Sequence, residues 1–207
     1  MLGSLVILVL GAGTLVAVQD VRGERPRRQP APPESPARPV PEVSFKLEHV
    51  KRITTVANTR EDEVDRVARE VRAVVERLYA AGFVDPARWR GGAFPEVLEL
   101  FAVRAGRHAR RDLGHLTLGG DASHVVLVRP TRERLRVTLL IGTERAPVAA
   151  VAHTRFRAEA ELADGGALHI VHRGEYTMRP EAGAWRIVGY RVRGNLSSGS
   201  AAGGDSS

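Results

Sequence analysis

The second half of the chain contains a succession of strand-like segments, and this pattern limits the possible folds more than any other feature. These segments are rich in Val, Leu, Ile, Thr and aromatic residues, and short turn-forming segments separate them: 123–129, 134–142, 148–162, 167–179 and 184–193. Within the third segment, Thr154, Phe156 and Ala158 alternate with Arg155 and Arg157. This alternation predicts antiparallel strands that bury one face and leave the other in water.

Helical patterns precede the strands. Residues 60–81 carry apolar side chains at the i, i+3, i+4, i+7 spacing of an amphipathic helix, which we expect Gly82 to end. Asp85-Pro86 predicts a short helical turn, and residues 95–112 predict a further helix. Residues 42–56 are expected to form an edge strand or an extended lead-in.

The order of these elements predicts the fold class. No strand–helix–strand alternation is present, so a parallel doubly wound sheet is excluded. We therefore expect a single α+β domain over residues 43–195, with about three N-terminal helices packed on a curved antiparallel sheet.

The N-terminal segment is the most apolar part of the sequence. Residues 1–19 contain no charged side chain and would span about 28 Å as a helix, which is just enough for a bilayer core. We expect a single transmembrane anchor; the alternative is a cleaved signal peptide, although no basic residue precedes the apolar run. Arg22 and Arg25 follow the segment, and the positive-inside rule alone would put the remaining chain in the cytoplasm.

Two segments of biased composition flank the domain. Residues 20–42 contain seven prolines and five arginines and predict a semi-rigid linker. Residues 196–207 consist mainly of Ser, Gly and Ala and predict a disordered tail. The expected organisation is therefore an anchor (1–19), a linker (20–42), the α+β domain and the tail.

The net charge of +7 is spread in a way that argues against nucleic-acid binding. Residues 19–60 carry nine basic and five acidic side chains, so the longer remainder is nearly balanced.

Cysteine is absent, which excludes disulfides and thiolate chemistry. No glycine-rich phosphate loop is present. Three potential metal ligands lie near the end of a predicted helix, His108, Asp112 and His115, but the sequence offers no fourth ligand to complete a metal site. We expect no cofactor, no metal and no nucleic-acid partner.

The helix at 60–81, the Asp85-Pro86 turn, the helix at 95–112 and the closing strand around 183–190 resemble the nuclear transport factor 2-like (SnoaL-like) superfamily. The resemblance implies a cone-shaped domain. With the anchor and linker, the chain is similar to actinobacterial membrane-anchored members such as mammalian-cell-entry-associated proteins and assembly subunits of conjugative type IV secretion systems. It implies a domain outside the cytoplasm, in the cell envelope, that contacts protein partners. A homo-oligomer is a further expected partnership of this chain.

Enzymatic members of this superfamily resemble open cones that hold an acid–base set in a pocket. The candidates here are Tyr79, Asp85, Asp112, His115, His153, His172 and Tyr176. His172 and Tyr176 are expected on the same strand face, with His169 on the other. A single histidine on an apolar face is more often a core residue. The leading hypothesis is a non-catalytic interaction protein of a transport or secretion assembly, and the first alternative is an isomerase, cyclase or dehydratase. A lesser alternative is a protein that binds a polyanion or lipid headgroups through its arginines.

Two surface features are candidates for partner contacts. Trp89 and Phe94 flank a Gly-Gly pair and predict a contact patch, a lid or, as the favoured interpretation, buried lining. The outer sheet face is rich in arginine, including Arg155 and Arg157, and could dock an acidic partner. Because Glu159, Glu161 and Glu175 interleave the arginines, we expect cross-strand ion pairs there instead: Arg134, Arg136, Arg155, Arg157, Arg173, Arg191 and Arg193.

Overall fold

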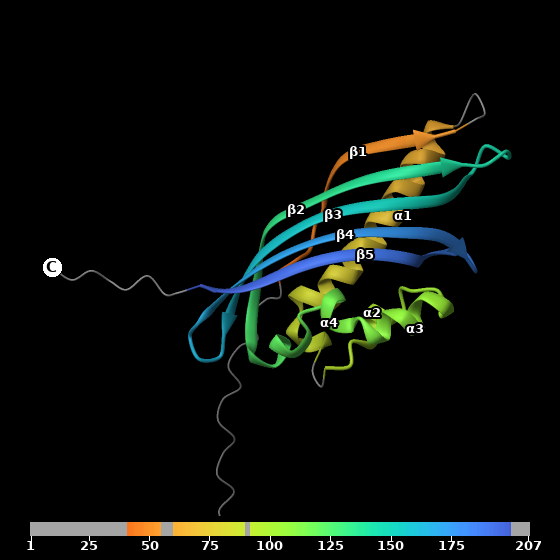
Figure 1. The fold of residues 1–207 in the computed structure, drawn as a ribbon. Helices are drawn as coiled ribbons and strands as arrows, with labels where there is room; N and C mark the ends of the chain where they lie inside the picture. The colour runs from red at the N-terminus through yellow and green to blue at the C-terminus, as the bar shows by residue number, and fades with distance from the viewer. Residues whose placement is uncertain (1–40, 55–59, 90–91, 200–207) are drawn as a thin grey trace, which may run out of the picture. The chain divides into compact units, whose positions relative to one another are not determined.

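The computed structural model describes residues 41–54, 60–89 and 92–199 (Figure 1). The predicted anchor, nearly all of the predicted linker and residues 200–207 of the predicted tail lie outside these residues. No helix among the described residues has the length and apolar character needed to cross a membrane.

One five-stranded sheet forms the body of the domain, in the order β1-β2-β3-β4-β5. Its strands are β1 (Lys46–Ile53), β2 (Val125–Ile141), β3 (Pro147–Leu162), β4 (Ala167–Glu181) and β5 (Ala184–Gly199). Strands β2 to β5 form an antiparallel meander, as the alternation predicts. The wholly antiparallel sheet expected from the sequence is wrong at one edge, because β1 pairs with β2 in parallel. The helices between these strands supply the long crossover that a parallel pair requires.

Two strand boundaries differ from the predictions. Strand β2 runs through the predicted break at 130–133, and its register with β3 shifts between Pro130 and Arg132. A bulge of this kind accommodates a proline without ending the strand. Strand β5 continues to Gly199 and pairs with β4 as far as Ala167, so the first residues of the predicted tail, 196–199, are strand.

Helix α1 (Glu61–Tyr79) confirms the predicted amphipathic helix, with its apolar stripe buried against the sheet. Acidic residues at Glu61, Asp62 and Glu63 favour its N-terminus electrostatically. The predicted end at Gly82 is wrong, because a π-helical turn, Ala80–Val84, continues the chain. Gly82 is instead a close-packing position, where an added Cβ would lie 3.2 Å from the Leu116 carbonyl oxygen.

The single helix predicted over 95–112 is divided in the structure. It consists of α2 (Pro95–Leu98) and α3 (Val103–Arg111), and α4 (Leu113–Leu116) follows. The break occurs where Ala102 N–H donates to the Ile187 carbonyl and Ile187 N–H donates to the Leu100 carbonyl. Backbone hydrogen bonds to β5 replace the helical hydrogen bonds at this point. The apolar periodicity of residues 95–112 could not predict this break, because it depends on a residue far away in the sequence.

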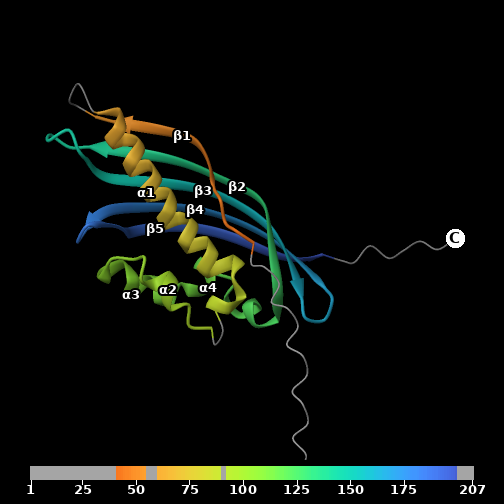
Figure 2. The same ribbon diagram turned by 180° about the vertical axis from the view of Figure 1, so that it is seen from behind.

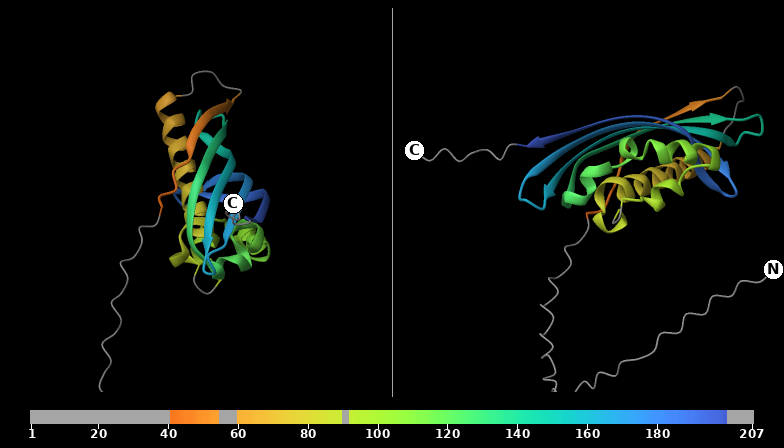
Figure 3. Two further views of the ribbon diagram at one scale, coloured as in Figure 1. Left: turned by 90° about the vertical axis from the view of Figure 1, so that its left-hand side faces the viewer. Right: turned by 60° about the horizontal axis from the view of Figure 1, so that its bottom comes forward.

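All the helices cover the same, concave face of the curved sheet, as Figures 2 and 3 show. Alternate residues of β2, including Leu135, Val137 and Leu139, are buried under them. The residues between, such as Arg134 and Arg136, point to the opposite face. The predicted site residues on the sheet are therefore divided between the interior under the helices and the outer face of the sheet.

Candidate functional site

A buried polar cluster lies in the interior, where α1, β3 and β4 meet. Tyr79 Oη of α1 is 2.7 Å from Thr154 Oγ1 of β3 and 2.7 Å from His172 Nδ1 of β4. His172 Nε2 is 3.1 Å from the carbonyl oxygen of His115. The cluster thus unites two sequence candidates, Tyr79 and His172. Alternation placed Thr154 on this face, but no sequence signal indicated that its hydroxyl group would complete the cluster.

The hydrogen bonds fix the state of the His172 ring. A carbonyl oxygen only accepts, so His172 Nε2 carries the proton and donates to His115. Nδ1 then accepts from the Tyr79 hydroxyl group. Burial lowers the pKa of His172 to about 4, and the hydrogen bond to the His115 carbonyl opposes this shift only partly. The ring is therefore neutral at pH 7.

Tyr176 lies in the same interior, as the shared strand face predicts, but differs in its hydrogen bonding. Its Oη is buried and has no hydrogen-bond partner within the described part of the chain. Burial, with a smaller effect of neighbouring Tyr79, raises the pKa of Tyr176 well above the usual value. Its ring covers Gly174, where an added Cβ would lie 2.3 Å from the ring. Only a glycine leaves room for the ring in this position.

Aromatic side chains fill the space around the cluster. The Tyr79 ring centroid lies 4.9 Å from that of Phe45 and 4.9 Å from that of Phe156. Phe83 packs on His172, with its ring centroid 4.8 Å from that of the imidazole. His172 is 2% exposed and Tyr176 is fully buried. The titratable groups of the interior, Tyr79, His172 and Tyr176, are therefore almost completely removed from solvent.

The remaining acid–base candidates lie apart from the cluster. Asp112 is exposed at the end of α3 and accepts a 2.7 Å hydrogen bond from Tyr190. Asp85 caps the short turn at Pro86–Arg88, as predicted. The His115 side chain is exposed, and His153 lies on the outer face of the sheet. Among the described residues, no three His, Cys, Asp or Glu side chains are placed to hold a metal ion.

Trp89 and Phe94 are buried, at 3% and 2% exposure. Trp89 Nε1 donates to the Ala122 carbonyl at 3.2 Å, and the two rings lie 6.2 Å apart. The buried lining interpretation is confirmed. Neither ring forms an exposed patch in this structure.

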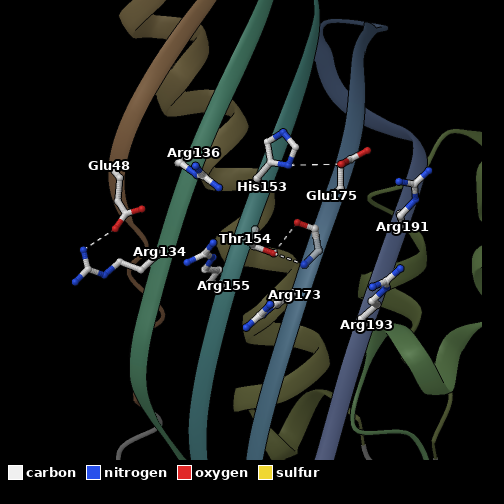
Figure 4. A pocket seen from close by; sticks show the side chains of 11 residues that line it. Glu48, Arg134, Arg136, His153, Thr154, Arg155, Arg173, Glu175, Arg191 and Arg193 are labelled. Carbon is white, nitrogen blue, oxygen red and sulfur yellow. Dashed lines mark hydrogen bonds and ion pairs between the residues drawn. The ribbon is translucent and has the colours of Figure 1, made fainter.

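The outer face of the sheet holds a polar groove of about 200 Å³ (Figure 4). Glu48, Arg134, Arg136, His153, Thr154, Arg155, Arg173, Gly174, Glu175, Arg191 and Arg193 line it. The groove brings together predicted outer-face residues from four strands and adds Glu48 from β1.

Like charges face each other across this groove. In the strand register, Lys46 is opposite Arg134, Arg134 opposite Arg155, Arg155 opposite Arg173, and Arg173 opposite Arg193. We call these five residues, one from each strand, the basic row. Register depends on turn lengths and bulges, so the sequence indicated an arginine-rich face but not this alignment. Lys46 was missed as a member for the same reason.

Most predicted ion pairs on this face are absent from the described residues. Arg134 pairs with Glu48 at 2.6 Å, and His153 lies 3.6 Å from Glu175. Arg155, Arg173 and Arg193 form no ion pair or side-chain hydrogen bond with any residue that the structure describes. The expectation of cross-strand pairing is wrong for these three, since each has a basic residue as its neighbour in the row.

Comparisons with known proteins give little further information. No family model matches the chain, and no curated protein matches it. Among solved structures, a hexachlorocyclohexane dehydrochlorinase (LinA) type 2 is similar with a TM-score of 0.39 and 11% sequence identity. The match covers 67% of this chain and 93% of that one. At these values, neither activity nor substrate transfers to this protein.

Proposed function

We propose that this chain is a non-catalytic binding protein of the bacterial cell envelope, held at the membrane by residues 1–19. The observation that carries the non-catalytic part is the filled interior. His172 and Tyr176, the best acid–base candidates, are enclosed by aromatic side chains and used in packing. General acid–base catalysis requires a group within hydrogen-bond reach of the substrate, and nothing reaches these two without displacing the core.

The enzyme alternative requires the interior to open. A substrate pocket would need at least the volume now taken by rings such as Phe83 and Phe156. Asp112, the third catalytic candidate, is on the surface and separate from His172, so it does not orient that ring. An isomerase, cyclase or dehydratase activity therefore lacks an assembled acid–base site among the residues that the structure describes.

We assign the domain to the nuclear transport factor 2-like superfamily as part of this proposal. Its support is the order of helices before a meander and the placement of all helices on one concave sheet face. Membrane-anchored members similar to this chain place the domain outside the cytoplasm. A proline-rich linker of residues 20–42 would raise the local concentration of the domain near membrane partners, as an accessory subunit of a transport or secretion assembly requires.

Diethyl pyrocarbonate labelling of the native full-length chain tests the filled interior. His169 is exposed on the same strand as His172 and serves as the matched control. We expect His169 to react and His172 to be protected until the protein unfolds. Equal labelling of both rings would show an accessible interior and would favour the enzyme.

Membrane fractionation tests the anchor separately. The full-length chain is expected in the membrane fraction after an alkaline wash, and a variant without residues 1–19 in the soluble fraction. Recovery of a soluble mature protein that begins just before the prolines would contradict the anchor and support the signal peptide.

A further inference from the structure

The basic row brings five cations together where the fold does not need them. Side chains directly opposite on neighbouring strands lie about 4.5–5.5 Å apart at Cβ, and like charges in this position destabilise a sheet. Neutral side chains such as Gln or Thr would hold the same strands without this repulsion. Arg155, Arg173 and Arg193 are also unpaired among the described residues. Glu48 and Glu175 also line the groove, but they lie with Arg134 and His153. The row is therefore repulsive in the free protein, and an anion on Arg155, Arg173 and Arg193 would relieve that repulsion.

The groove itself indicates the type of anion. Glu48 Oε1 lies 2.6 Å from Arg134 Nη1 near one end of the row, so one carboxylate already pairs with an arginine of this face (Figure 4). Arginine pairs well with carboxylates because its planar fork matches their two oxygens. Arg155, Arg173 and Arg193 offer the same guanidinium group, and no carboxylate among the described residues is paired with them.

The groove lining disfavours two other polyanions. It contains no Phe, Tyr or Trp side chain on which a nucleobase could stack, and its one imidazole, that of His153, lies 3.6 Å from the Glu175 carboxylate. It also contains no large aliphatic side chain that could enter a bilayer interface, as surface-bound membrane segments do. An acidic peptide requires neither feature.

We propose that the basic row binds an acidic segment of a partner protein, with glutamate or aspartate carboxylates paired to Arg155, Arg173 and Arg193. At about 4.8 Å between strands, the row spans roughly 19 Å, the length of an extended segment of about six residues. This inference rests on the proposed binding role but not on the membrane anchor.

Binding of a fluorescein-labelled peptide of ten glutamates to the full-length protein in detergent tests the proposal. The variant R155Q/R173Q removes two unpaired members of the row. The control R104Q/R107Q makes the same charge change on the exposed face of α3. At 50 mM salt we expect at least fivefold weaker binding for R155Q/R173Q and less than a twofold change for the control. Thermal unfolding of both variants checks that the fold is retained.

Three results would overturn the proposal: no peptide binding by the unchanged protein, equal weakening by the two variants, or tighter binding of another polyanion. The polyanions to compare are a ten-nucleotide single-stranded RNA and vesicles of phosphatidylglycerol, each tested on the same variants. Failure of the anchor in fractionation would leave the peptide result unaffected. Reactivity of His172 in labelling would overturn the non-catalytic role and not this binding site.

Discussion

Acidification is expected to destabilise the domain through His172 before most carboxylates are protonated. In the folded state its ring is neutral, because burial lowers its pKa from the usual 6.5 to about 4. In the unfolded chain the ring is solvated and takes up a proton near pH 6.5. Between these two values the unfolded state binds more protons than the folded state, so stability is lost as the pH falls.

The size of the effect follows from the two pKa values. Each unit of difference corresponds to about 1.4 kcal/mol, so His172 should lower the free energy of unfolding by about 2 kcal/mol at pH 5 and by about 3 kcal/mol at pH 4, relative to pH 7.5. Small domains have stabilities of only about 5–15 kcal/mol, so a loss of this size is measurable.

Urea unfolding followed by circular dichroism at pH 7.5, 6, 5 and 4 measures this loss. His172→Gln and His172→Phe both remove the titrating ring, and His169→Gln is the matched exposed control. Either His172 variant should be about 2 kcal/mol less sensitive to the change from pH 7.5 to 5 than the unchanged protein, whatever its stability at neutral pH. The control should keep the full pH dependence. The reasoning is refuted if H172Q and H172F show the same pH dependence as the unchanged protein.

Four substitutions test the packing and charge arguments. Tyr176→Phe removes a buried hydroxyl group without a partner and should leave stability unchanged or raise it by about 1 kcal/mol, as measured by urea unfolding. Tyr79→Phe leaves the buried His172 Nδ1 without a hydrogen bond and removes one of the partners of the Thr154 hydroxyl group, so it should cost about 1–3 kcal/mol in the same assay. An equal effect of the two Tyr→Phe changes would contradict the hydrogen-bond assignment. Gly174→Ala places a methyl group in the Tyr176 ring and should cost about 1–3 kcal/mol, less in a Tyr176→Ala background. Arg173→Gln should raise the thermal midpoint at low salt, with a gain that shrinks at 0.5 M NaCl; a lower midpoint would show that Arg173 stabilises the free fold.

Local patterns predicted the elements better than the contacts between them. The apolar stripe of α1 and the alternation in β3 indicated both elements and their buried faces, because burial depends on periods within one segment. The division of the helix at 95–112 depends on backbone pairing with Ile187, which lies far away in the sequence. The parallel pairing of β1 likewise depends on topology rather than on its own residues.

The candidate site shows the same distinction. Alternation placed His172, Thr154 and Tyr176 on one face, yet only the packing of α1 on the sheet brings Tyr79 to His172 and closes the interior. The sequence shows that the outer face is rich in arginine, and the glutamates between the arginines suggested ion pairs. The sequence does not show which residues of neighbouring strands lie opposite each other, so the alignment of arginine with arginine could not be predicted. A shift of one residue in any strand would have moved its arginine to the buried face.

The two faces of the sheet differ in what their side chains do for the free protein. Inside, each titratable group except Tyr176 has hydrogen-bond partners, and aromatic rings exclude water, so the arrangement is accounted for by stability alone. Outside, Arg155, Arg173 and Arg193 lie in register with other cations, and stability alone would disfavour them. Departures from locally stable arrangements concentrate at functional sites. The search for a ligand is therefore better directed to the basic row than to the interior that the superfamily resemblance suggests.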